Sequence, residues 1–180
     1  MLKTYSECLE EFGYDGAICN KLANKSLFRV YRGLYSNHPY ASWLEICAKR
    51  YPKALVSMES SFFYWGLTDR NPEKMHLTTD RDAAKITDTR IAQHFVPAGL
   101  LELGAVVRSY NGVEFRTYDL ERTAIDLVRA QKKLDFDLYK EVIQSLRQRV
   151  SELYPAKIDD YLEFFPYKKS LKAAIEKEIF

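Results

Sequence analysis

The chain has 180 residues, of which 47% are hydrophobic and 29% are charged, and its formal net charge at pH 7 is +2. This composition supplies enough apolar material for a folded core, which excludes a disordered chain. No apolar run reaches the roughly 18 to 20 residues of a membrane span, and the acidic N-terminal segment lacks the apolar core of a signal peptide, so we expect a cytoplasmic protein that contacts no membrane.

The first part of the chain predicts two short helices. Apolar residues recur at three- and four-residue steps over 2–12 and predict a helix that Gly13 ends. Asp15 is the expected N-cap of a second helix, whose inward face holds Ile18 and Leu22. The outward face of this second helix is polar and basic, and its residues are Asn20, Lys21, Asn24 and Lys25.

A short basic hairpin is predicted next. Residues 27–31 and 34–35 are β-prone, and Arg32 and Gly33 form the turn between them. Two short helices followed by a basic hairpin indicate a winged helix-turn-helix that binds DNA. Only 26 residues precede Leu27, so one of the usual three helices is expected to be missing or shortened. The sequence leaves open whether this module needs the second domain or a dimer mate to brace it.

The predicted domain boundary follows a helix over 41–50. Pro52 disfavours helical backbone before it, which gives a winged helix-turn-helix over 1–53 and a larger domain over 54–180. Between Tyr14 and Lys53 the chain has seven basic and two acidic residues, a net charge of +5, which leaves −3 for the rest. A basic surface on such a module attracts the phosphates of duplex DNA.

The second domain is predicted to be α+β with its helices gathered at the C-terminal end. Asn111 and Gly112 form the turn of the clearest hairpin, since both residues tolerate positive φ. Asp119 is the expected N-cap of a helix whose apolar stripe leaves Glu121 and Arg122 outside. The predicted strands and helices are 75–79, 91–96, 106–110 and 113–118, followed by 120–129, 136–150 and 171–179.

Nothing in the sequence predicts catalysis, a cofactor or a metal site. His38, His76 and His94 are isolated in the sequence from one another and from the three cysteines, and no HExxH, CxxC, GxSxG or Walker pattern is present. The aromatic run 62–65 is expected to be mostly core, because consecutive side chains point in different directions. We therefore expect no enzyme, with a nuclease of dispersed carboxylates as the least favoured alternative.

Three segments resemble, in the same order, those of the AbiEi family of abortive-infection antitoxins. These segments are LFRVYRGLY, PKALVSMESSFFYWGLT and YDLERTAIDLVR, at 27–35, 52–68 and 118–129. In that family a winged-helix domain precedes an antitoxin domain, an Arg-Gly-hydrophobic-Tyr turn ends the wing, and an ERTxxD helix marks the second domain. The matching residues here are Arg32, Gly33, Leu34 and Tyr35, and Glu121, Arg122, Thr123 and Asp126.

The resemblance implies a transcriptional regulator and antitoxin of a toxin–antitoxin operon. Such a protein binds double-stranded DNA at its own operator and opposes a nucleotidyltransferase toxin, with no stable complex required. Asparagine amides read adenine edges and basic side chains neutralise phosphates, so the candidate DNA-binding residues are Asn20, Lys21, Asn24, Lys25, Arg29 and Arg32. A homodimer on an inverted repeat is one expected arrangement.

Two alternatives stay open at this stage. Glu121, Arg122 and Asp126 either tie their helix to the preceding hairpin or offer a charged surface to a partner. The whole chain is either this DNA-binding regulator or, in the second hypothesis, a protein-interaction module that neutralises a toxin directly and keeps a vestigial DNA-binding arm.

Overall fold

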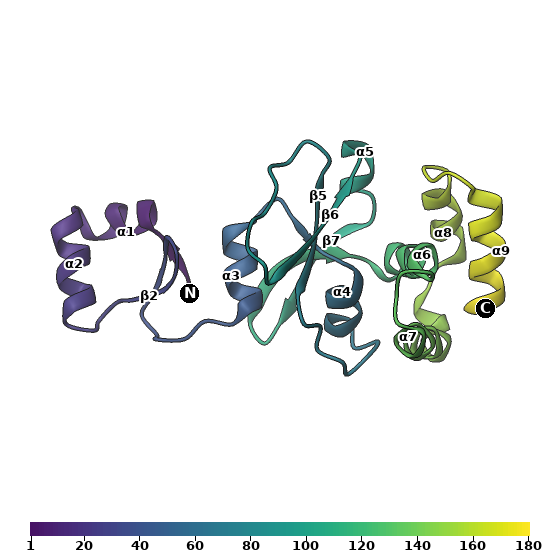
Figure 1. The fold of residues 1–180 in the computed structure, drawn as a ribbon, viewed down its shortest axis with the longest axis horizontal. Coiled ribbons are helices and arrows are strands. Elements are labelled where there is room, and N and C mark those ends of the chain that lie inside the picture. The colour runs from purple at the N-terminus through teal and green to yellow at the C-terminus, as the bar shows by residue number, and fades with distance from the viewer. The chain divides into compact units, whose positions relative to one another are not determined.

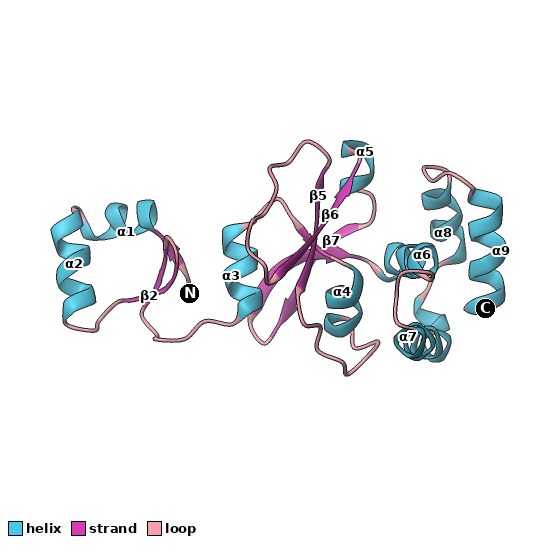
Figure 2. Ribbon diagram, viewed as in Figure 1, coloured by secondary structure: helices cyan, strands magenta, loops and turns pink.

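The computed structural model describes all 180 residues and has the predicted α+β fold. The chain divides into two compact units. Unit 1 comprises Met1–Pro52 and Gly112–Glu114, and unit 2 comprises Lys53–Asn111 and Phe115–Phe180. The division after Pro52 lies one residue before the predicted boundary. Figure 1 labels the main elements of both units, and Figure 2 separates helices from strands.

Unit 1 consists, in chain order, of a strand, two helices, a hairpin and a third helix. These elements are β1 (Lys3–Thr4), α1 (Tyr5–Phe12), α2 (Asp15–Ala23), β2 (Phe28–Tyr31), β3 (Leu34–Ser36) and α3 (Trp43–Arg50). The three strands form an antiparallel sheet in the order β1-β3-β2. Two helices followed by a hairpin, α1, α2 and β2–β3, have the order of a helix-turn-helix with a wing.

The helices of unit 1 begin where their capping groups allow. The predicted helix over 2–12 starts only at Tyr5, because the Thr4 side chain accepts a hydrogen bond from the backbone N–H of Glu7 and the Glu7 carboxylate accepts one from Thr4. Asp15 is the first residue of α2 and not its N-cap. Its carboxylate accepts a hydrogen bond of 2.9 Å from the Tyr5 hydroxyl instead.

The small sheet of unit 1 is packed on both faces. Leu34 and Tyr35 are neighbours on β3, so their side chains point to opposite faces. Tyr35 packs with Cys8, Ile18 and Leu27, which join α1 and α2 to the sheet. Leu34 packs with Leu2 of the N-terminus and Ile46 of α3. A helix that follows the wing therefore supports the face of the sheet turned away from α2.

Unit 2 joins a mixed five-stranded sheet to a group of helices. Its elements are β4 (Leu55–Val56), α4 (Met58–Tyr64), β5 (Met75–Asp80), β6 (Ile91–Val96), α5 (Ala98–Leu101), β7 (Ala105–Tyr110), β8 (Val113–Tyr118), α6 (Leu120–Ala130), α7 (Phe136–Gln148), the 3-10 turn η1 (Val150–Glu152), α8 (Pro155–Leu162) and α9 (Lys168–Glu178). The strand order is β6-β5-β4-β8-β7, and β5 pairs parallel to β6 but antiparallel to β4.

The predicted hairpin β7–β8 is confirmed. Asn111 and Gly112 have φ angles of 49° and 79°, as a two-residue turn of this type requires. The aromatic run is core only at its first position, since Phe62 is fully buried while Phe63 and Trp65 are half-buried. The sequence did not predict β4, α4, α5 or α8.

The four helices at the C-terminal end of unit 2 share one apolar core. Its fully buried members include Ala124, Ile125 and Leu127 on α6 and Leu146 on α7, and Ile175 joins α9 to them. Pro155 starts α8, where its missing N–H would have no partner in any case. None of the helices combines the length and the apolar character that a transmembrane span needs.

Candidate nucleic-acid interface

Helix α2 turns one stripe of its surface to solvent. Ile18 is buried in the core of unit 1 and fixes the rotation of the helix. The four residues on the opposite side follow helical spacing and are all exposed: Gly16, Cys19, Asn20 and Ala23. Asn20 therefore lies on the exposed side of α2, as predicted, together with Gly16, Cys19 and Ala23.

The structure gives the four predicted residues of this region different roles. The Asn20 side chain is exposed and makes no hydrogen bond within the chain. The Lys21 ammonium lies 4.7 Å from the centre of the Phe12 ring. The Asn24 side-chain oxygen accepts hydrogen bonds of 3.1 and 2.7 Å from the backbone N–H and hydroxyl of Ser26. Lys25 is exposed in the turn after the helix, with a φ of 59°.

The wing carries two exposed arginines. Arg29 lies on β2 opposite Tyr35, and Arg32 forms the two-residue turn of the hairpin with Gly33, which has a φ of 75°. Neither guanidinium pairs with a carboxylate within the chain. Tyr35 is only 8% exposed, as expected for a packing residue. The hydrogen-bond donors of both arginines are thus available to phosphates or to a groove.

An ion pair connects the first and third helices of unit 1. The Lys49 ammonium lies 2.6 Å from the Glu7 carboxylate, and this contact together with the backbone N–H of Thr4 lowers the pKa of Glu7 to about 2. Because Glu7 also belongs to the capping box of α1, its carboxylate stays ionised where two elements meet. The pair therefore helps to hold α1 against α3, and Lys49 is not a free phosphate ligand.

The ERTxxD residues of α6 are buried, which corrects the prediction that Glu121 and Arg122 lie outside the apolar stripe. Arg122 is fully buried, and its guanidinium donates to Asp126 at 3.1 Å and to the carbonyls of Leu100 and Leu103 at 2.9 and 3.0 Å. The i, i+4 pair of Arg122 and Asp126 forms as predicted. The Arg122 guanidinium attaches α6 to α5 and to the turn after α5, so it is not exposed to a partner.

Two acidic residues at the start of α6 bind α8 in a similar way. Glu121 is 3% exposed and accepts hydrogen bonds from the backbone N–H of Tyr154 and the ammonium of Lys157, at 3.1 and 3.2 Å. Asp119 caps α6 and accepts a hydrogen bond of 2.7 Å from Tyr161. Burial and this hydrogen bond raise the pKa of Tyr161 to about 12. The cluster is a polar link between helices.

Two of the histidines that are distant in the sequence are in contact in the fold. His76 on β5 and His94 on β6 have ring nitrogens 3.1 Å apart and stacked rings. Burial lowers the pKa of both, that of His76 to about 4. The carboxylate of Glu59 lies 3.9 Å from His76. No group of three or more His, Cys, Asp or Glu side chains is arranged to hold a metal ion.

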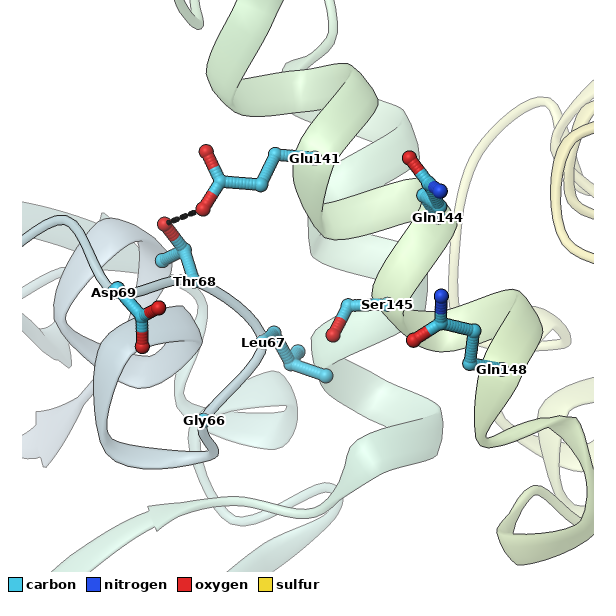
Figure 3. A pocket seen from close by; sticks show the side chains of 8 residues that line it. All are labelled: Gly66, Leu67, Thr68, Asp69, Glu141, Gln144, Ser145 and Gln148. Carbon is cyan, nitrogen blue, oxygen red and sulfur yellow. Dashed lines mark hydrogen bonds between the residues drawn. The ribbon is translucent and has the colours of Figure 1, made fainter.

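A polar groove of about 230 Å³ lies in unit 2 between the turn after α4 and helix α7. Figure 3 shows Thr68 hydrogen-bonded to Glu141, with Gln144, Ser145 and Gln148 further along α7. Arg70 pairs with the same carboxylate at 2.9 Å. The carboxylates of Asp69 and Glu141 also line the groove, so its lining offers hydrogen bonds and negative charge.

Comparison with known proteins shows that this chain resembles a solved structure in its fold only. A scan against protein-family models finds no match, and a search of curated proteins finds none. Among solved structures, the chain is similar to the RV2827C protein from Mycobacterium tuberculosis, with a TM-score of 0.66 and 11% sequence identity. The match covers 97% of this chain and 72% of that one, so both units are part of the shared fold.

Proposed function

We propose that this protein is a DNA-binding transcriptional regulator and the antitoxin of an abortive-infection operon. It binds double-stranded DNA at its own promoter and opposes a nucleotidyltransferase toxin. The observation that carries the DNA-binding part is the combination, in unit 1, of the exposed face of α2 with a wing whose Arg29 and Arg32 have no ion-pair partner. The antitoxin part rests on the resemblance of the three segments to AbiEi antitoxins.

The proposed docking uses the geometry of winged helices. Helix α2 enters the major groove with Asn20 toward the bases, and the hairpin of β2 and β3 lies along the adjacent backbone. Lys21, Lys25 and Arg29 neutralise phosphates around this contact. The packing of α3 against the sheet braces the wing in this proposed arrangement. We place the protein in the cytoplasm, where its operator lies.

A homodimer on an inverted repeat is part of this proposal. Two-fold symmetric regulators bind half-sites about one helical turn apart, roughly 34 to 36 Å. We expect two protomers on a duplex with both half-sites and one protomer on a duplex with a single half-site. The mass of each complex, measured by light scattering, distinguishes this stoichiometry from a monomer that binds the full site.

The direct experiment is a gel shift with the DNA upstream of the gene. The full chain is expected to bind this duplex at least about 1,000-fold more tightly than an unrelated duplex of equal length and composition, the lower end of the usual range for specific regulators. A reporter driven by the upstream DNA is expected to be repressed when the protein is supplied. Equal affinity for both duplexes, without repression, would contradict the regulator function.

The second candidate function is direct neutralisation of a toxin by the helical end of unit 2. It is favoured by large aromatic side chains that this end exposes, since exposed apolar surface marks protein interfaces. These residues are Tyr154, Phe164 and Tyr167, which are 68%, 60% and 85% exposed. A stable complex with the product of the neighbouring gene in size-exclusion chromatography, together with no DNA shift at low salt, would favour this function over the first.

A further inference from the structure

We infer that the protein reads DNA sequence through two side chains, Asn20 on α2 and Arg32 at the tip of the wing. The operator half-site then contains an A·T base pair under α2 in the major groove and an A·T-rich minor groove under the wing. This inference rests on the proposed function, because it specifies the DNA that the same surface selects.

The first part of the inference comes from the side chains of α2 whose hydrogen-bonding groups are free to contact DNA bases. Asn24 is occupied by its bonds to Ser26, and the Lys21 ammonium lies over the Phe12 ring. Among the exposed positions of the helix, Asn20 alone offers a free side-chain donor and acceptor at the centre of the stripe. A planar amide that donates and accepts at once matches the N6 and N7 atoms of adenine.

The size of the neighbouring side chains allows this contact. Asparagine is short, so its amide reaches base edges only when the helix backbone comes close to the floor of the groove. The other positions on the stripe, Gly16, Cys19 and Ala23, have side chains no longer than that of Asn20, and the exposed ring of Tyr14 lies against Gly16 at the N-terminal end of the stripe. The same short side chains have little hydrogen-bonding capacity of their own. Base reading by α2 therefore depends on one amide.

The second part of the inference comes from the wing. Arg32 occupies a two-residue turn, so its side chain is at the outermost point of the hairpin β2–β3. It is exposed and unpaired, whereas Arg29 lies three residues earlier on the flank of β2. An arginine at a narrow tip fits the minor groove, and A·T-rich segments attract it because their narrow groove strengthens the negative potential. Arg29 is left to contact the backbone.

The test is selection of binding sites from a randomised duplex library with the full chain. The wild type is expected to select an A·T pair at one major-groove position and an A·T-rich flank. Asn20→Ala should abolish the preference at that single position, where about tenfold to hundredfold discrimination is expected, and leave the salt dependence unchanged. Arg32→Ala should abolish the flank preference. Asn37→Ala, which removes an exposed amide of unit 1 outside α2 and the wing, should select the wild-type site.

A variant that selects a different base must be folded, so a changed base preference cannot be explained by a folding defect. Asn20→Asp places an acceptor without a donor on the same stem, so its selected base should shift from adenine toward cytosine, whose N4 amino group donates. The inference is overturned if the wild type selects a G·C pair under α2, or if both Asn20 variants select the wild-type site. Salt-dependent, sequence-specific binding would still uphold the proposed function in that case, whereas loss of all specific binding by the wild type would overturn the function itself.

Discussion

Arg122 holds a fully buried charge at the junction of three segments. Its guanidinium satisfies Asp126 and the carbonyls of Leu100 and Leu103, and it lies over the rings of Tyr118 and Phe165. Taking one partner out of such a group leaves buried polar atoms that water cannot reach, which costs more than the pair contributes when it is intact. The ERTxxD residues thus act on the stability of unit 2.

We expect Arg122→Met to lower the free energy of unfolding by about 3 to 5 kcal/mol, because it leaves Asp126 and two carbonyls without this donor. The matched control is Arg129→Met. Arg129 pairs with the same Asp126 at 2.9 Å, but its side chain is 37% exposed, so its loss should cost less than about 1 kcal/mol. Denaturant unfolding of both variants checks the difference, and equal effects would contradict the structural role of Arg122.

The contact between His76 and His94 predicts a loss of stability in mild acid. Burial, together with the neighbouring ring of His94, lowers the pKa of His76 in the fold to about 4, whereas the unfolded chain titrates near 6.5. Between these values the unfolded state binds more protons, so the stabilisation is present above about pH 6.5 and is lost as pH falls toward 4. We expect a loss of about 1 to 3 kcal/mol over this range.

The measurement is the unfolding free energy at several pH values, for the wild type and for His76→Gln/His94→Gln. The double variant should show a much flatter dependence between pH 6.5 and 4.5, because its amides do not titrate. Glu59, Asp126 and Lys133 also influence the two rings, and all three remain in the variant. An unchanged pH profile would show that other groups cause the acid sensitivity.

The predictions failed for residues whose contact partners are distant in the chain. Arg122 was expected outside the apolar stripe because it is charged, but the carbonyls that satisfy it are 19 and 22 residues earlier. His76 and His94 are 18 residues apart and meet only because β5 and β6 pair in parallel. Helical and strand periodicity describe one element at a time, so contacts of this kind could not be derived from them.

At the level of the elements, Gly104 allows the turn before β7 to approach α6 closely. Its φ is 78°, and a Cβ there would lie 2.7 Å from Cβ of Arg122 and 3.1 Å from the Asp119 carboxylate. Neither neighbour can move without disturbing the polar cluster at the start of α6. The glycine is therefore required by backbone conformation and by space together.

We expect Gly104→Ala to lower the free energy of unfolding by about 2 to 5 kcal/mol, as the sum of left-handed strain and overpacking. Gly66→Ala is the matched control, because Gly66 has a φ of 66° and a methyl group there would meet no other atom within 4 Å. It should cost only about 1 to 2 kcal/mol of backbone strain. Thermal unfolding measures the stability of both variants. A larger loss of stability in Gly66→Ala than in Gly104→Ala would contradict the close packing of Gly104 against α6.

The elements that the sequence predicted well have strong local signals. The β7–β8 hairpin has its Asn-Gly turn, α6 has Asp119 as its N-cap, and α7 has a regular apolar stripe. The unpredicted β4 has only two residues, and it exists because β5 and β8 pair with it from both sides. In α2 the buried Ile18 and the exposed Asn20 are as predicted, whereas Asn24 and Lys25 are exposed beyond the last residue of the helix, Ala23.

At the scale of the whole molecule, positive charge gathers in one segment of unit 1, although the two units carry similar formal charges. The segment from Tyr14 to Lys53 carries +5 and the rest of the chain −3, while Glu7, Glu10 and Glu11 offset part of this charge within unit 1, so the positive field belongs to α2, the wing and the end of α3. The sequence predicted this local positive charge and the two-part α+β fold. It could not predict that α3 would support the wing sheet, because that depends on packing between segments on either side of the wing.

The most direct test of the central claim is the salt dependence of binding to the upstream duplex, for the wild type and for Arg29→Ala/Arg32→Ala. If about four to six phosphates are neutralised by each protomer, the log–log slope of affinity against salt should be about −4 to −5, and the variant should make it shallower by about 2. The control Arg81→Ala/Lys169→Ala removes two exposed charges from unit 2 and should keep the wild-type slope. A slope near zero for the wild type, or equal slopes for the wild type and the wing variant, would contradict binding through the wing of unit 1.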